Sequence, residues 1–113
     1  FHNNGLDSDE NFSDFGLYVT TGSDLDKAKF KTPTLRNIEV TGPYMHDGRF
    51  STLEEVIEHY NSGGHASSTV DPLMKNIGDG LLLSPEDKQA LLAFLRTLTD
   101  EEFLNNPEFS NPF

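Results

Sequence analysis

A chain of 113 residues is long enough for one small domain, and its 19 acidic against 8 basic side chains give a net charge of −11. This charge argues against nucleic acid and anionic membranes as partners, because both attract basic surfaces. The absence of cysteine excludes disulfides, thiolate metal sites and covalent attachment of a c-type haem within these residues. The longest apolar runs are also too short to cross a bilayer.

The first 30 residues show neither the 3.6-residue period of a helix nor the alternation of a strand. We therefore expect a long ordered loop, of the kind that is usually functional or held in place by a ligand. The acidic run at residues 7–11 resembles part of a calcium loop, but it lacks the glycine and the terminal glutamate of an EF-hand, which favours a solvated turn. The side chains expected to be buried singly in this loop are Phe12, Phe15, Leu17 and Tyr18.

Prolines and glycines punctuate residues 30–50 and predict turns, with a short helical turn at residues 34–37. Met45 and His46 stand together in this stretch, beside Asp47. A thioether is either a haem-iron ligand or a core group. A histidine next to an aspartate in a turn is a base, a ligand or a structural group, and the sequence alone leaves these alternatives open.

The first clear helix is predicted to begin at Ser51, in a capping box with Glu54. Leu53, Val56, Ile57 and Tyr60 then form one apolar face, and Gly63–Gly64 ends the helix. Tyr60 is thereby predicted to point inward. Periodicity alone favours a core tyrosine for such a position.

Residues 64–83 are predicted to form a second loop, with a turn near Asp79. A second helix follows, capped by Ser84 and with Pro85 at its first position. Its expected apolar stripe consists of Leu91, Phe94, Leu95 and Leu98. A short final helix at residues 99–102 and a tail at residues 105–113 complete the prediction.

Zinc is a weak alternative for the histidines. His46, His59 and His65, together with Asp47, supply suitable ligand types, but no pair has the spacing of a helical zinc motif. The fingerprints of phosphate-binding loops, dinucleotide-binding folds and serine hydrolases are also absent from the sequence.

Four short motifs occur in an order that is more informative than any one of them alone. Phe30–Asn37 reads FKTPTLRN, Val40–Gly48 reads VTGPYMHDG, and TLEEV and LLAFLRTLT follow at residues 52–56 and 91–99. This series resembles the C-terminal haem domain of dihaem cytochrome c peroxidases and their MauG relatives. The opening FHNNG is similar to the segment that follows the second haem-attachment motif of that family. The resemblance extends over nearly the whole chain.

The resemblance implies a mainly α, cytochrome c-like haem domain with few helices and long ordered loops. Residues 1–113 would form the C-terminal part of that domain, without the C-x-x-C-H segment that attaches haem c. The family carries a peroxidatic haem in an N-terminal domain and an electron-transfer haem in the C-terminal one. The implied function is therefore electron transfer to the peroxidatic haem in a periplasmic oxidoreductase that uses hydrogen peroxide.

The resemblance also implies roles for individual residues. The distal ligand of the electron-transfer haem is Met in typical peroxidases and Tyr in MauG-like proteins, and the matching residue here is Tyr60, with Met45 as runner-up. Arg36 would contact a haem propionate, for which the alternative is a surface ion pair. His46 would lie near the haem edge. Backbone oxygens of Thr41 and Pro43 would contribute to a calcium site between the domains.

No catalytic residue is expected in this fragment, which alone should not turn over peroxide. The implied partners are the missing N-terminal haem domain and an electron-donor protein or small cytochrome. Without haem, we expect a loosened or homodimeric fragment. The alternative is a haem-free binding module that kept the fold and binds calcium or a protein. A C-x-x-C-H motif encoded roughly 10–20 residues upstream would favour the oxidoreductase, since that motif must reach the same haem.

Overall fold

The computed structural model describes residues 1–74 and 76–101. Within them the regular elements are helical, and extended backbone pairs only in isolated bridges such as His2 with Phe30 and Tyr44 with Phe50. The prediction of a mainly α chain with long loops is confirmed, whereas the cytochrome c-like class stays a prediction. The elements are η1 (Asp9–Asn11), α1 (Tyr18–Thr21), η2 (Asp24–Asp26), η3 (Ile38–Val40), α2 (Leu53–Ser62) and α3 (Pro85–Arg96), where η marks a 3-10 turn.

Helix α2 begins one residue later than the predicted capping box requires. The cap is Thr52, whose hydroxyl accepts a hydrogen bond from the Glu55 amide at 3.3 Å. Ser51 instead donates to the Glu55 carboxylate. The predicted cap at Ser51 is wrong because Thr52 keeps extended dihedrals, with φ −127° and ψ 156°, so its own hydroxyl reaches the first turn.

The inward face of α2 agrees with the periodicity. Leu53 and Ile57 are buried, and Val56 and Tyr60 are half-buried. The helix ends at Gly63 as predicted, with a φ of +91°. A β-carbon there would come within 2.5 Å of the Asn76 carbonyl oxygen, so the close approach of the second loop requires glycine.

Helix α3 is capped as predicted, with reciprocal hydrogen bonds between Ser84 and Asp87 and with Pro85 at its first position. The predicted stripe is partly wrong. Leu92 is the buried residue, whereas Leu91 and Phe94 are 39% and 55% exposed. A helix advances by about 100° per residue, so the contact with α2 and η3 follows the row through Leu92 and turns its neighbours outward.

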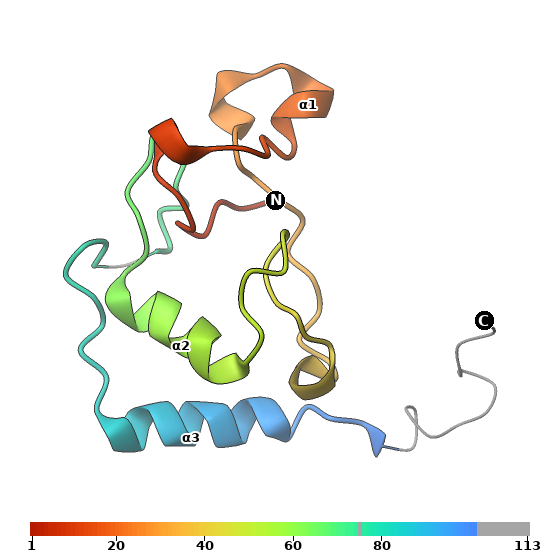
Figure 1. Ribbon diagram of the computed structural model, residues 1–113, viewed down its shortest axis with the longest axis vertical. Helices are drawn as coiled ribbons and strands as arrows, with labels where there is room; N and C mark the ends of the chain where they lie inside the picture. Colours follow the sequence, from red (N-terminus) through yellow and green to blue (C-terminus); the bar gives the residue numbers. More distant parts are fainter. Residues whose placement is uncertain (75, 102–113) are drawn as a thin grey trace.

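The core lies where α2, α3 and the turns of residues 38–50 meet, and Figure 1 shows α2 running beside α3. The shortest principal extent is 19 Å, against 44 and 38 Å for the other two, so the molecule is thin in that direction. Accordingly, no described side chain is less than 2% exposed. The core is therefore lean. It consists of Tyr44, Leu53, Ile57 and Leu92, with Ile38, Phe50, Val56 and Leu95 packed against them.

The N-terminal loop differs from the prediction in its packing. Phe12, Phe15 and Tyr18 are not buried singly, because their rings contact one another in a row. The Lys27 ammonium lies 5.2 Å from the centre of the Tyr18 ring. Half-buried rings gain from such mutual contact when no deep core is available.

Three predictions concern the ends of elements. The turn expected at residues 34–37 forms instead as η3 at Ile38–Val40, four residues further along, after Asn37 takes a left-handed φ of +61°. The short final helix reaches the described residues only at Glu101. Thr99 and Asp100, which were predicted to begin it, are not helical. Residue 102 and the tail at residues 105–113 lie outside the residues that the structure describes. None of the described helices is long and apolar enough to span a bilayer.

Candidate functional site

The opening segment is fixed by a buried asparagine. The Asn3 side-chain oxygen accepts from the Gly5 amide at 3.0 Å, which makes a local turn. Its amide group donates to Ser67 and Thr69 of the second loop, at 3.1 and 3.0 Å. Gly5 has a φ of +72°, and a β-carbon there would lie 3.1 Å from the His65 carbonyl oxygen. The FHNNG motif thus folds as a tight turn against the second loop.

Arg49 joins the opening segment to the turn before α2. Its guanidinium donates to both carboxylate oxygens of Asp7, at 3.0 and 2.8 Å, and to Asp47 at 2.7 Å. It also donates to the Leu6 carbonyl oxygen. Hydrogen bonding to Arg49 lowers the pKa of Asp7 and of Asp47, and the two carboxylates raise the pKa of Arg49.

Helix α2 is attached to the same segment through His59. Its Nε2 lies 2.8 Å from the Asn4 carbonyl oxygen, which can only accept, so this nitrogen carries the proton. Burial lowers the pKa of His59, which favours the neutral ring. The Gly5 carbonyl oxygen also accepts from the His65 amide at 2.6 Å. These hydrogen bonds therefore fix the position of the opening segment relative to the end of α2.

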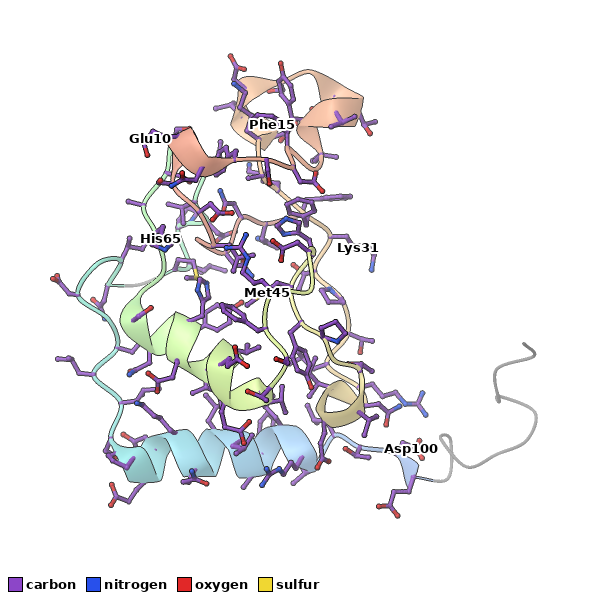
Figure 2. All side chains as sticks on the ribbon, viewed as in Figure 1. Glu10, Phe15, Lys31, Met45, His65 and Asp100 are labelled. Carbon is purple, nitrogen blue, oxygen red and sulfur yellow. The ribbon has the colours of Figure 1, made fainter. Side chains whose placement is uncertain are left out.

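These attachments bring three side chains together, here called the Asn4 cluster: Asn4, Met45 and Tyr60. The side-chain nitrogen of Asn4 lies 3.3 Å from the Met45 Sδ and 3.3 Å from the Tyr60 hydroxyl oxygen. All three are half-buried. In Figure 2, Met45 lies in the middle of the molecule, between α2 and the opening segment. A phenol oxygen and a thioether sulfur are both known haem-iron donors, so this donor set fits a haem.

The backbone of Met45 is itself unusual. Its φ is +73°, in the left-handed region that a residue with a β-carbon rarely adopts. The turn around it is closed by a hydrogen bond from the Gly48 amide to the Met45 carbonyl oxygen, at 3.2 Å. The bridge between Tyr44 and Phe50 flanks the turn. This conformation directs the thioether to Asn4 and persists because the surrounding contacts enforce it.

His46 stacks on Phe30, with ring centroids 3.9 Å apart and planes at 8°. Phe30 is paired in turn with His2 through a backbone bridge. His46 is exposed and lines a small hollow together with Phe30 and Asn4. The stack gives His46 a structural contact, and its predicted position at a haem edge stays a prediction.

The remaining predicted residues lie elsewhere. Arg36 forms an ion pair with Asp100 at 2.6 Å, and Figure 2 shows Asp100 beyond the end of α3, away from Met45. The surface ion pair weighed for Arg36 is thus present, and its contact with a propionate remains a prediction. Thr41 and Pro43 are exposed in the turn after η3. Their calcium role is likewise a prediction.

The zinc alternative receives no support from the geometry. Across residues 1–74 and 76–101, no three His, Cys, Asp or Glu side chains come together as a metal site. His59 is engaged with a backbone carbonyl, and His46 with an aromatic ring.

Asn4 was not predicted as a functional residue. The signal for it was present, since the FHNNG motif belonged to the family resemblance, but nothing in the sequence pointed to its contacts. Those contacts span 41 and 56 residues of chain.

No protein-family profile matches the chain. Curated relatives include the cytochrome-c peroxidase IdrP2 of Pseudomonas sp. (strain SCT), 42% identical over 92 residues, which are 81% of this chain and 23% of that protein. The methylamine utilization protein MauG of Methylorubrum extorquens is 37% identical, over 83% of this chain and 28% of that protein. A crystal structure of a MauG-like protein associated with microbial copper homeostasis matches with a TM-score of 0.86 and 43% identity, over 99% of this chain and 38% of that chain.

The fold is therefore shared with a MauG-like protein along almost the entire chain. The chain belongs to the cytochrome c peroxidase/MauG family, which confirms the predicted resemblance. It spans about a quarter of the length of the curated relatives that it matches, which is consistent with the predicted partial domain.

Proposed function

We propose that this chain is the distal-side segment of a cytochrome c-like haem domain in a peroxidase-type oxidoreductase. In this proposal, the complete protein passes electrons to a peroxidatic haem that reacts with hydrogen peroxide, in the periplasm. The observation that carries it is the convergence of Tyr60 and Met45 in a chain related to cytochrome c peroxidases and MauG.

Haem c, attached through a segment outside this chain, would supply one-electron chemistry at its iron. Tyr60 is the proposed distal ligand. A phenolate is a harder and more anionic donor than a thioether, so it stabilises ferric iron and lowers the potential relative to methionine. Such a centre favours storage of oxidising equivalents over simple electron relay.

The chain's own residues orient that ligand. Helix α2 carries Tyr60 in its last turn, and His59 on the same helix holds the backbone of Asn4. The half-burial of the cluster limits the access of water. The phenol is therefore presented by a fixed helix instead of a mobile loop.

Peripheral contacts are proposed for three further residues. Arg36 would exchange its pairing with Asp100 for a haem propionate, which a guanidinium can bind through two parallel hydrogen bonds. The carbonyl oxygens of Thr41 and Pro43 would contribute to calcium binding, because calcium prefers hard oxygen ligands.

The proposed partners are an N-terminal haem domain and a basic electron donor such as a small cytochrome. A shallow, solvent-open surface on α2 supports the latter, since Glu54, Glu55 and Glu58 line it beside Phe50. Lys88 and Arg96 of α3 offset part of the charge of Glu58 and Glu54. Together with the net charge of −11, this surface would attract a basic partner over a long range.

Characterisation of the complete gene product tests the proposal. We expect a C-x-x-C-H motif upstream of Phe1, two haems per chain after maturation of c-type haem, and peroxide-dependent oxidation of a reduced cytochrome. A correctly folded product without Soret absorption would refute the proposal.

A haem-free binding module is the second candidate, and one observation favours it. Among the described residues, no buried side-chain nitrogen or oxygen lacks a hydrogen-bond partner. A segment whose buried side-chain polar atoms are all hydrogen-bonded without a cofactor incurs no desolvation penalty for these groups when haem is absent. A cooperative melting transition of residues 1–113 by themselves, together with a lack of haem in the complete product, would support this candidate.

A further inference from the structure

The side-chain amide of Asn4 serves two acceptors at once. Its nitrogen lies 3.3 Å from the Met45 Sδ and equally far from the Tyr60 hydroxyl oxygen. An amide nitrogen carries two hydrogens, so each acceptor receives one. A thioether has no hydrogen to give, and the atom of Asn4 that faces it must therefore be the nitrogen. The chemistry of Met45 thus fixes the orientation of the amide.

Asn4 is also held firmly from both sides along the chain. Its backbone carbonyl oxygen accepts a hydrogen bond from the His59 Nε2 at 2.8 Å. The preceding Asn3 is buried and bonded to Ser67 and Thr69, and the carbonyl oxygen of the following Gly5 accepts from the amide of His65. The side chain therefore starts from a fixed backbone, and its two donors are preorganised toward the two acceptors.

We propose that Asn4 is a positioning residue that decides which of the two proposed donors, Tyr60 or Met45, binds the haem iron. This inference rests on the proposed function, because it assumes an iron atom on this side of the chain. It goes further by assigning the choice of ligand to a residue that itself does not touch the iron.

The two hydrogen bonds of Asn4 have unequal consequences for ligand choice. A hydrogen bond to an anionic oxygen is roughly twice as strong as one to a neutral acceptor. With haem bound, the amide would therefore strengthen its hydrogen bond to the Tyr60 oxygen when that oxygen is the iron ligand. Its bond to Met45 occupies the sulfur, which is a weak acceptor and a neutral ligand. Both effects favour tyrosinate ligation over thioether ligation.

Removal of the amide should reverse this preference. Asn4→Asp keeps the shape of the side chain, removes both donors and places a negative charge beside the phenolate. Asn4→Leu removes the donors without adding charge. In the full-length, haem-matured protein we expect each variant to lower the ratio of tyrosinate-ligated to thioether-ligated haem by about tenfold or more, as the loss of a charge-assisted hydrogen bond implies.

Optical and electron paramagnetic resonance spectra, with the midpoint potential, measure this ratio independently of activity. The thioether species should disappear again when Met45→Leu is added to either Asn4 variant. Asn11→Asp is the matched control, since Asn11 is exposed and bonds only locally to Ser8 among its described contacts. Circular dichroism melting should show that every variant compared is folded.

The outcomes separate this inference from the proposed function. If Tyr60→Phe changes the spectrum and both Asn4 variants change it as described, the inference stands. If Tyr60→Phe changes the spectrum while folded Asn4 variants keep the wild-type ligand ratio and potential, the inference is overturned and the proposed function survives. An unchanged spectrum in Tyr60→Phe would overturn the ligand assignment, and the inference with it.

Discussion

Asn37 shows how one residue can join distant segments. It is buried and adopts a φ of +61°. Its backbone N–H donates to the Leu98 carbonyl oxygen at 2.9 Å, and its side-chain oxygen accepts from the backbone N–H of Asp100 at 2.6 Å. Asparagine tolerates the left-handed region and supplies the acceptor, so both properties are used. The last residue of the FKTPTLRN motif thereby ties η3 to the end of α3.

We expect Asn37→Ala to lower the free energy of unfolding by about 2 kcal/mol, because it strains the backbone and leaves the Asp100 amide without its acceptor. Asn37→Gly keeps the backbone relaxed and should cost about half as much. Urea unfolding of both variants measures the difference. Equal stabilities would contradict the role assigned to the left-handed backbone.

Single residues were predicted unevenly from the sequence. The inward position of Tyr60 followed from the helical period, since that rule needs only neighbouring residues. The role of Asn4 depends on three segments that meet only after folding, and the left-handed backbone of Met45 leaves no trace in composition. Local rules therefore gave Tyr60 its inward position, the family resemblance gave it the ligand role, and neither pointed to Asn4.

The start of helix α2 depends on a small difference between two neighbouring residues that can both cap it. Ser51 and Thr52 are both good capping residues, and the sequence gives either one a partner three positions on. The extended dihedrals of Thr52 settle the choice. The predicted start of α2 was consequently wrong by one residue, while the cap of α3 at Ser84 was right because Pro85 follows it.

Alanine at each position distinguishes the two caps. Thr52→Ala should lower the free energy of unfolding by about 1 kcal/mol, because the Glu55 amide loses its acceptor. Ser51→Ala, the matched control, removes only an exposed side-chain contact and should stay within about 0.5 kcal/mol of wild type. If Ser51→Ala lowered the free energy of unfolding more than Thr52→Ala did, Ser51 would be the cap, as the sequence predicted.

The faces of α3 give a second test at this scale. Leu92 is 4% exposed and packs in the core, so Leu92→Ala should cost about 2–5 kcal/mol. Phe94 is 55% exposed on this chain, and Phe94→Ala should lower the free energy of unfolding by less than about 1 kcal/mol. Thermal melts of the full-length, haem-matured protein would contradict this account if the two variants lost similar stability.

The stripe on α3 was misjudged for a reason that belongs to the whole molecule. Leucines and a phenylalanine on several sides of a helix do not tell which side meets the core. In this thin molecule the core covers only the side of α3 that carries Leu92. Periodicity predicted the two main helices and the family resemblance implied the mainly α class, whereas the direction of packing required the arrangement of α2, α3 and η3.

The acid stability of the molecule should depend on Arg49. The pKa of Asp7 is lowered in the folded state, so its ion pair stabilises the fold at pH values above the ordinary carboxyl pKa of about 4. This contribution is lost as the pH falls through the lowered pKa. Both side chains are partly exposed, which limits the effect to about 1 kcal/mol.

We therefore expect Asp7→Asn to be less stable than wild type at pH 7 and similar to it at pH 2, as measured by urea unfolding in matched salt. Asp79→Asn serves as the control, because Asp79 is exposed, and it should follow wild type at both pH values. A constant gap between Asp7→Asn and wild type across this range would show that the ion pair is not the cause.

The central claim is that Tyr60 binds haem iron in a peroxidase-type protein, and the optical spectrum of the haem-matured, full-length protein tests it most directly. Tyr60→Phe keeps the ring and removes the proposed ligand atom, while Tyr18→Phe makes the same change in the aromatic row of the N-terminal loop. We predict that Tyr60→Phe abolishes the tyrosinate signature of one haem and that Tyr18→Phe preserves it. A wild-type spectrum in folded Tyr60→Phe would contradict the claim.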